Sequence, residues 1–100
     1  MEKIFEEIKK IGEKHGCGKI VLFGSRARGD NRERSDIDLA VYGLDDDKRG
    51  YFWWDIDELP TLLKIDLVYV SGWTSEELLK NIERDGVVIY ERFADKEGKI

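Results

Sequence analysis

The sequence predicts an α+β domain with α/β-like order, in which helices pack on a mixed, mainly four-stranded sheet. Short apolar runs rich in β-branched residues alternate with longer segments whose apolar residues recur at helical spacing. Their order is helix, strand, short helix, strand, helix, strand, helix, strand, which favours helices layered on one sheet. A chain of 100 residues has room for one core. We therefore expect one domain at residues 1–93 and a frayed tail at residues 94–100.

The first half of the chain predicts a helix followed by two strands. Residues 3–14 place apolar side chains on one face and Lys and Glu on the other, as a surface helix does. Residues 20–23 form an apolar run typical of a strand buried on both faces, and the run ends at Gly24. Residues 25–30 can form one helical turn. Residues 36–42 then alternate between polar and apolar, which predicts the second strand.

The second half predicts two more helices and two more strands. Acidic residues 45–47 precede a helix that carries residues 51–59 and ends at Pro60. Residues 65–70 predict the third strand. Thr74 and Glu77 have the spacing of a capping box, which opens a helix that ends at Gly86. Residues 87–90 predict the last strand.

The composition is that of a soluble globular protein with an acidic surface. The net charge of -5 argues against a domain that coats nucleic acid, because that affinity comes mainly from Lys and Arg. No apolar run approaches the roughly 20 residues that span a bilayer, so we expect a cytoplasmic protein that does not insert in membranes. The only cysteine, Cys17, and the only histidine, His15, are expected to be a packing residue and a helix-end residue.

Aspartates in two predicted strands are candidate metal ligands. Asp36 and Asp38 lie two residues apart, so their side chains leave the same face of a strand. Like charges this close repel, and Mg²⁺, which prefers oxygen ligands, would relieve the repulsion. A solvated pair at a sheet edge is the alternative. Asp66 is an isolated carboxylate in the apolar third strand, where a buried, unpaired charge would be costly. If that strand neighbours the second in register, the three acids can hold one or two metal ions.

The turn after the first strand is a candidate phosphate site. Gly24 permits a sharp turn, Ser25 offers a hydroxyl and an amide, and the helical turn that follows would point free N–H groups at an anion. Arginines make this stretch locally basic, and guanidinium groups match phosphate geometry, although arginines at a protein surface often have no such role. They are Arg26, Arg28, Arg32 and Arg34.

These residues together resemble the signature of the DNA polymerase beta-like nucleotidyltransferase superfamily, in which Gly-Ser is followed by ten residues and then Asp-x-Asp. Asp66, within Ile-Asp-Leu-Val, is similar to the third acid of that superfamily, and the resemblance spans about residues 18–71. It implies that Asp36 and Asp38 are catalytic and bind Mg²⁺, with Asp66 as third ligand or base. The nucleotide-binding residues it implies are Gly24, Ser25, Arg26, Arg28 and Ser35.

The short chain is similar to minimal nucleotidyltransferases (MNT), which pair with a small helical protein of the HEPN type. The resemblance implies the antitoxin of a HEPN/MNT toxin–antitoxin pair, an Mg²⁺-dependent enzyme that transfers AMP from ATP to a hydroxyl of its partner. One alternative is a non-catalytic nucleotide-binding antitoxin or regulatory subunit that masks its partner. Another is a fold with a decayed site.

Four consecutive aromatic residues, at positions 51–54, surround one turn of the predicted helix and cannot all face one core. The simplest expectation is that two pack inward and two are half-covered. An exposed patch would instead indicate a protein interface, and stacking on a nucleotide base is a third alternative. We expect Tyr69 in the core and Trp73 as a loop anchor.

Overall fold

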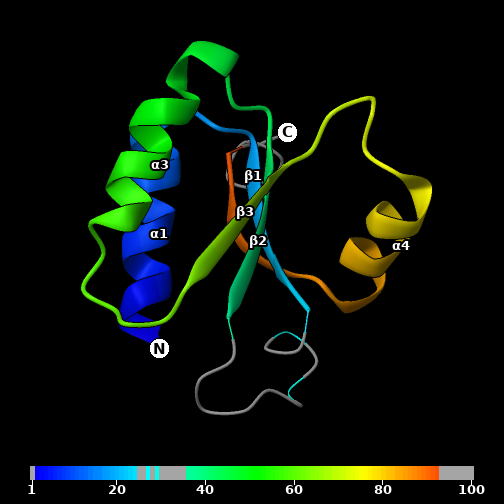
Figure 1. The fold of residues 1–100 in the computed structure, drawn as a ribbon, viewed down its shortest axis with the longest axis horizontal. Coiled ribbons are helices and arrows are strands. Elements are labelled where there is room, and N and C mark those ends of the chain that lie inside the picture. Colours follow the sequence, from blue (N-terminus) through cyan, green and yellow to red (C-terminus); the bar gives the residue numbers. More distant parts are fainter. Residues whose placement is uncertain (1, 25–26, 28, 30–35, 93–100) are drawn as a thin grey trace, which may run out of the picture.

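Two helices cover one face of a four-stranded sheet, and a third helix lies on the other face (Figure 1). A computed structural model describes residues 2–24, 27, 29 and 36–92. Most of the predicted helical turn at residues 25–30, and all of the predicted tail at residues 94–100, lie outside these ranges. The elements are α1 (Glu2–His15), β1 (Lys19–Phe23), β2 (Ile37–Tyr42), the 3-10 helix η1 (Asp46–Lys48), α3 (Arg49–Asp57), β3 (Ile65–Tyr69), α4 (Glu76–Asp85) and β4 (Val87–Glu91).

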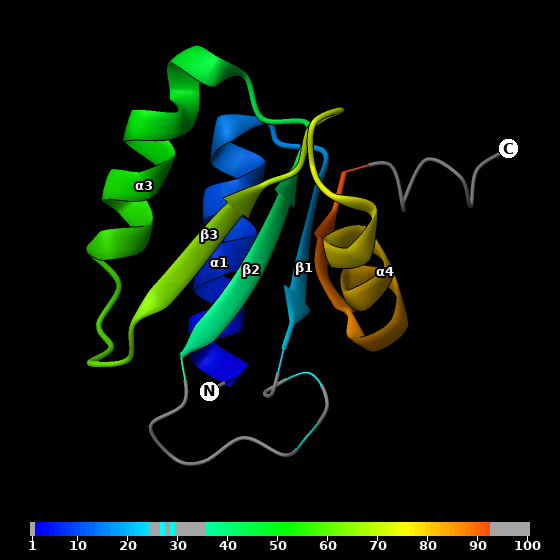
Figure 2. The same ribbon diagram turned by 45° about the vertical axis from the view of Figure 1, so that its right-hand side comes forward.

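The sheet is mixed, as predicted, with strand order β3-β2-β1-β4. β1 pairs antiparallel with both β2 and β4, whereas β2 and β3 are parallel. A parallel pair needs a crossover connection, and α3 provides it. In Figure 2, α1 lies behind β2 and β3 with α3 at the left, and α4 lies at the right, beside β1. The predicted α+β class is therefore confirmed.

The main core lies between the sheet and the α1–α3 layer. Alternate residues of β2, namely Ile37, Leu39 and Val41, point into this core. Ile8 of α1 and Phe52 of α3 meet them there, and both are fully buried. The remaining β2 side chains therefore face α4, and this alternation decides which face of the sheet carries the acids.

A smaller core lies under α4. Its buried members are Val21 of β1, Ala40 of β2 and Ile82 of α4. Cys17 is fully buried in the main core, as expected of a packing residue, and burial raises the pKa of its thiol to about 11. None of the helices described here has the length and apolar character that crossing a bilayer requires.

The start of α4 differs from the prediction by one residue. Ser75 is the N-cap, and its side chain accepts a hydrogen bond from the backbone N–H of Leu78. The Thr74 hydroxyl instead accepts from the backbone N–H of Ser71 at 2.9 Å. The predicted Thr74–Glu77 capping box is therefore wrong, because a tight turn before the helix uses the threonine.

The aromatic run on α3 is more exposed than expected. Phe52 is buried with Ile56, four residues later on the same face of the helix. Tyr51, Trp53 and Trp54 are exposed, because only one side of α3 meets the rest of the domain. The expectation of two buried and two half-covered rings was wrong, and the run forms an exposed patch.

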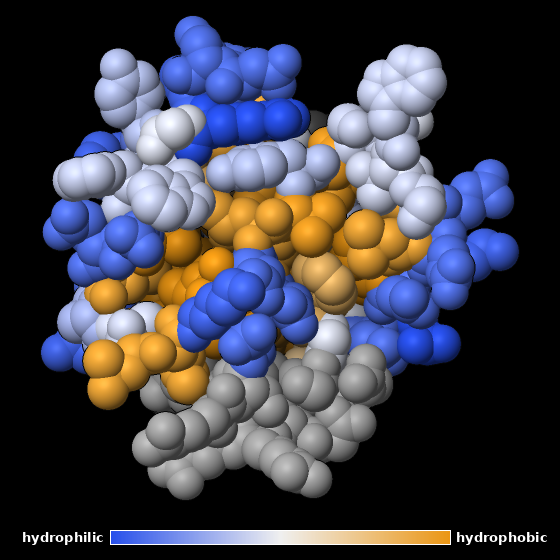
Figure 3. All heavy atoms as spheres, viewed as in Figure 1, coloured by the Kyte–Doolittle hydropathy of each residue, from blue (hydrophilic) through white to orange (hydrophobic). Residues whose placement is uncertain are grey.

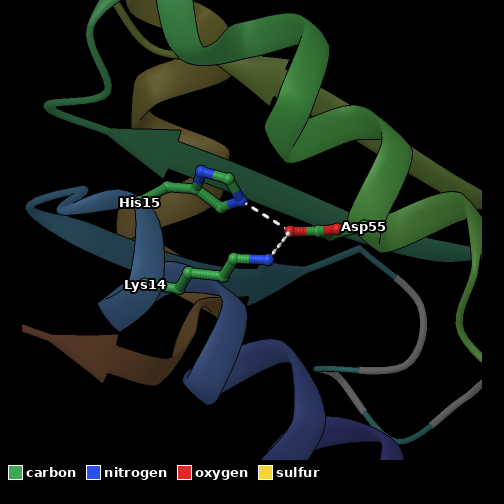
Figure 4. Close-up of polar contacts among 3 residues, drawn as sticks. All are labelled: Lys14, His15 and Asp55. Atoms are coloured by element: carbon green, nitrogen blue, oxygen red, sulfur yellow. Dashed lines mark hydrogen bonds and ion pairs between the residues drawn. The ribbon is translucent and has the colours of Figure 1, made fainter.

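A polar contact joins the ends of the two helices in this layer (Figure 4). His15, the last residue of α1, places Nε2 2.7 Å from Asp55 Oδ2 on α3, and Lys14 Nζ lies 3.1 Å from the same oxygen. The His15 ring also packs edge-on against Phe52. The contacts with His15 and then Lys14 lower the pKa of Asp55. His15 is thus a helix-end residue, as predicted, and its contact with Asp55 links α1 to α3.

We predict that Phe52→Ala lowers the free energy of unfolding by about 3–5 kcal/mol, because it leaves a cavity in the main core. Trp54→Ala, on the exposed side of the same helix, should cost less than about 0.5 kcal/mol. Urea unfolding of both variants measures the difference. Equal costs would mean that the assigned inward face of α3 is wrong.

We also predict that Asp55→Asn lowers the free energy of unfolding at pH 7 by about 1 kcal/mol, through loss of the contacts with His15 and Lys14. The lowered pKa means that this contribution is present above the unfolded pKa of about 4 and disappears as the pH falls through the folded value. Urea unfolding between pH 7 and pH 2 should show that the difference in the free energy of unfolding between Asp55→Asn and the native chain falls towards zero. Asp57→Asn, an exposed change on the same helix, is the control. A difference that does not depend on pH would contradict the prediction.

Candidate active site

The parallel pairing of β2 and β3 brings two of the predicted acids together. Asp38 and Asp66 are direct partners across the two strands, so their side chains leave the same face of the sheet. This is the face that carries α4, because Ile37 and Leu39 point to the opposite core. Asp36 lies just before β2 and is exposed. The register that the sequence analysis required for Asp66 is therefore present.

The acids are close enough to affect one another. Burial raises the pKa of Asp38, and the negative charges of Asp66 and then Asp36 raise it further. Within the described ranges, however, no three carboxylate, histidine or cysteine side chains already have the spacing of a metal site. The structure thus brings Asp38 and Asp66 side by side, and the three-acid metal cluster stays a prediction.

Gly24 lies directly against one of these acids. It follows β1, whose last residue, Phe23, is paired with Asp38. Its φ of 79° is in the left-handed region, and a Cβ at this position would lie 2.5 Å from Asp38 Oδ2. A larger residue would be strained by the backbone conformation and would force the Asp38 carboxylate to move. The expected sharp turn after the first strand is therefore confirmed at Gly24.

The other predicted phosphate ligands lie outside the described residues, so their roles stay predictions. They are Ser25, Arg26, Arg28 and Ser35, together with the neighbouring Arg32 and Arg34.

Asp66 differs from the prediction in its surroundings. β3 is an edge strand, and 40% of the Asp66 side chain is exposed, so it is not a buried, unpaired charge. Lys64 Nζ lies 3.5 Å from Asp66 Oδ1. Lys64 was not predicted as part of the site, although it lies two residues before Asp66, a spacing that places side chains on the same face of extended chain.

The chemistry of these residues fits a divalent cation such as Mg²⁺. The donors are carboxylate oxygens, the ligand type that Mg²⁺ prefers. Burial and then the negative charges of Asp66 and Asp36 raise the pKa of Asp38 and so disfavour its ionised form, which a bound cation would stabilise. Asp36 and Asp38, with Asp66 across the sheet, are the residues that would hold the ion.

Two hollows lined by described residues lie away from Asp38 and Asp66. One of about 270 Å³ is found beside the C-terminal end of α3, where Trp53, Leu63 and Ile65 line it. Another of about 400 Å³ lies between α1 and α3, beside Tyr51 and Trp54. Neither is lined by Asp38 or Asp66, so the assignment of the site depends on the acids and Gly24.

Comparison with known proteins identifies the family. Residues 6–95 match the family described as "Polymerase beta, Nucleotidyltransferase". This chain belongs to that family. A protein of Methanocaldococcus jannaschii, provisionally named a protein adenylyltransferase, is 34% identical to this nucleotidyltransferase over 92 residues, which cover 89% of the chain and 94% of the relative. Protein adenylyltransferase MntA of Thermococcus cleftensis is 36% identical over 56 residues, or 56% of the chain and 43% of that protein.

Solved structures agree with this assignment. A chain in the crystal structure of a toxin–antitoxin with AMP-PNP matches this nucleotidyltransferase with a TM-score of 0.70 and 26% identity, covering 93% of it and 77% of that chain. A chain from tri-AMPylated Shewanella oneidensis HEPN toxin in complex with MNT antitoxin matches with a TM-score of 0.65. The two chains are 24% identical, and the match covers 96% of this nucleotidyltransferase and 76% of the matched chain. At that identity the match supports the fold alone.

We predict that Asp38→Asn raises the free energy of unfolding of the metal-free nucleotidyltransferase at pH 7 by about 0.5 kcal/mol, because it removes the repulsion between paired like charges. A raised folded pKa means that the native protein loses stability as the pH rises from the unfolded pKa through the folded one. The gain should therefore be larger at pH 7 than at pH 3.

Thermal unfolding with and without Mg²⁺ completes this test. Mg²⁺ should raise the Tm of the native chain and have a smaller effect on Asp38→Asn, because binding to the folded state stabilises it. Asp45→Asn, an exposed change in the loop after β2, is the control and should respond to Mg²⁺ as the native chain does. An equal Mg²⁺ response in Asp38→Asn would contradict a metal site at this residue.

Proposed function

We propose that this chain is an Mg²⁺-dependent protein adenylyltransferase that transfers AMP from ATP to a hydroxyl of a HEPN-type partner, as the antitoxin of a toxin–antitoxin pair. The observation that carries the proposal is the pairing of Asp38 with Asp66 beside Gly24. The relatives named protein adenylyltransferase, and the match to a toxin–antitoxin structure with AMP-PNP, support the choice of nucleotide and acceptor. A location in the cytoplasm, where ATP is available, accords with it.

The nucleotide is held between the turn after β1 and the acids. Gly24 lets the backbone approach the triphosphate, and Ser25 and Ser35, with Arg26 and Arg28, contact its oxygens. Asp36, Asp38 and Asp66 are the residues that would hold one or two metal ions. When bound, Mg²⁺ supplies positive charge that stabilises the phosphate oxygens during transfer.

The chemical step is an in-line displacement at the α-phosphorus. The acceptor hydroxyl oxygen forms a bond to the α-phosphorus, and the bond from that phosphorus to the bridging oxygen of the β-phosphate breaks. Pyrophosphate leaves with the bonding electron pair. The hydroxyl proton passes to the Asp66 carboxylate, whose partial exposure gives an incoming acceptor access.

A second function has specific support. Tyr51, Trp53 and Trp54 expose aromatic surface on the face of the domain opposite the acids. Such surface can bind a partner without catalysis, so an antitoxin that only masks its partner is the alternative.

Incubation with α-³²P-labelled ATP, Mg²⁺ and a purified HEPN-type partner protein tests the proposal. The native chain should label that protein, and Asp36→Asn combined with Asp38→Asn should reduce labelling by more than about 100-fold. Mutation of residues that only hydrogen-bond to metal ligands already lowers metal affinity or activity about 10- to 100-fold, and loss of two ligands should lower activity more. Asp45→Asn should label as the native chain does.

The same variants separate catalysis from masking. The growth-inhibiting activity of the partner is measured with each variant present in excess. If the double variant silences the partner as fully as the native chain does, masking is sufficient and the proposed chemistry is not the antitoxin function. If only the native chain and Asp45→Asn silence it, transfer is required.

A further inference from the structure

α4 leaves the β3 side of the acid-bearing face of the sheet partly exposed. The helix packs over β1 and part of β2, where Ile82 meets Val21 of β1 and Ala40 of β2. Figure 2 shows α4 beside β1 and β4, with β3 at the opposite edge of the sheet. The residues that alternate with Asp66 on this face are Val68 of β3 and Val70, which directly follows the strand, and both are half-buried. An apolar strip therefore leads along β3 away from the acids.

Figure 3 shows hydrophobic surface reaching from the sheet to α4 on this side of the molecule. Val70 and Leu78 lie at the edge of the smaller core, and Val68 adds to the strip nearer the acids. Contiguous apolar surface next to a polar site is typical of a surface that a partner covers.

The strip ends at an exposed tryptophan on an ordered turn. Trp73 lies in the connection between β3 and α4, and 97% of it is exposed. Its backbone N–H donates to the Ser71 hydroxyl at 3.2 Å, and the Ser71 backbone N–H donates to the Thr74 hydroxyl at 2.9 Å. The Thr74 N–H also donates to the Ser71 carbonyl at 3.2 Å. The sequence expectation of a loop anchor was wrong, because hydrogen bonds of the neighbours hold the turn while the indole is left in water.

We propose that Trp73 and the strip of Val68, Val70 and Leu78 form the docking surface for the acceptor protein. A protein whose hydroxyl reaches Asp38 and Asp66 must lie over this face, because α1 and α3 cover the other. Tryptophan on an ordered turn loses little conformational freedom on binding and is frequent among residues that dominate interface energy. The inference rests on the proposed function, since it takes the acceptor to be a protein.

The patch on α3 is the competing surface, and it lies in the wrong layer for transfer. Tyr51 and Trp54 are on the side of α3 that faces away from the sheet, with the main core between them and the acids. A protein bound there would have to reach around an edge of the sheet to bring a hydroxyl to Asp66. This makes Trp54→Ala a matched control, because it also removes one exposed indole.

The first experiment measures binding without catalysis. Dissociation constants for the purified HEPN-type protein are determined by titration calorimetry in the Asp36→Asn, Asp38→Asn background. Adding Trp73→Ala should weaken binding about 10- to 30-fold, the effect of one dominant interface residue, and Trp73→Phe should recover part of the loss. Trp54→Ala should leave the dissociation constant within about twofold of the value for the Asp36→Asn, Asp38→Asn background. An unchanged Tm shows that each variant is folded.

The second experiment measures transfer with both acids present. Trp73→Ala should raise KM for the partner by a similar factor and leave KM for ATP and kcat unchanged. A rise in KM for ATP without a change in partner binding would assign Trp73 to the nucleotide and overturn the inference. Loss of binding in Trp54→Ala but not in Trp73→Ala would overturn it in favour of the α3 patch. If the native chain transfers no AMP while Trp73→Ala still weakens binding, the proposed chemistry fails and the docking surface stands.

Discussion

The hydrogen-bonded register between β2 and β3 is the constraint on which the site depends. It places Asp38 opposite Asp66, although two like charges side by side are unfavourable. The sheet tolerates this arrangement because the opposite face of the same strands is apolar, and Ile37 and Leu39 are fully buried there. A shift of one residue would move those apolar side chains to the α4 face, so the main core holds the acids in register.

Much of this arrangement could be predicted from local pattern. The alternation at residues 36–42 showed which side chains share a face, and the apolar run at residues 20–23 showed a strand buried on both sides. Gly24 was recognisable as a turn residue before its contact with Asp38 was known. The pairing of Asp66 with Asp38 was only conditional, because strand order depends on contacts distant in sequence.

The errors have a shared physical origin, which is that sequence pattern does not show how much of an element its neighbours cover. Asp66 was expected to be buried because its strand is apolar, but β3 is at the edge of the sheet and Lys64 compensates part of the charge. Phe52 is buried and Trp54 is exposed to solvent, because α3 contacts the domain on one side only. Trp73 was expected to anchor its loop, yet the hydroxyl groups on either side of it already do so.

The placement of α4 explains how Asp38 and Asp66 can be fixed on a stable sheet and still be accessible to a ligand. If the helix lay over Asp38 and Asp66, it would bury them further, and burial would raise the cost of keeping them charged. It packs instead over Val21 of β1 and Ala40 of β2, where Ile82 completes the smaller core. The sheet is therefore stabilised from both faces, while Asp38 and Asp66 stay partly exposed. Asp38 is therefore half-buried: burial raises the pKa of its carboxyl group, and its side chain stays partly exposed to a ligand.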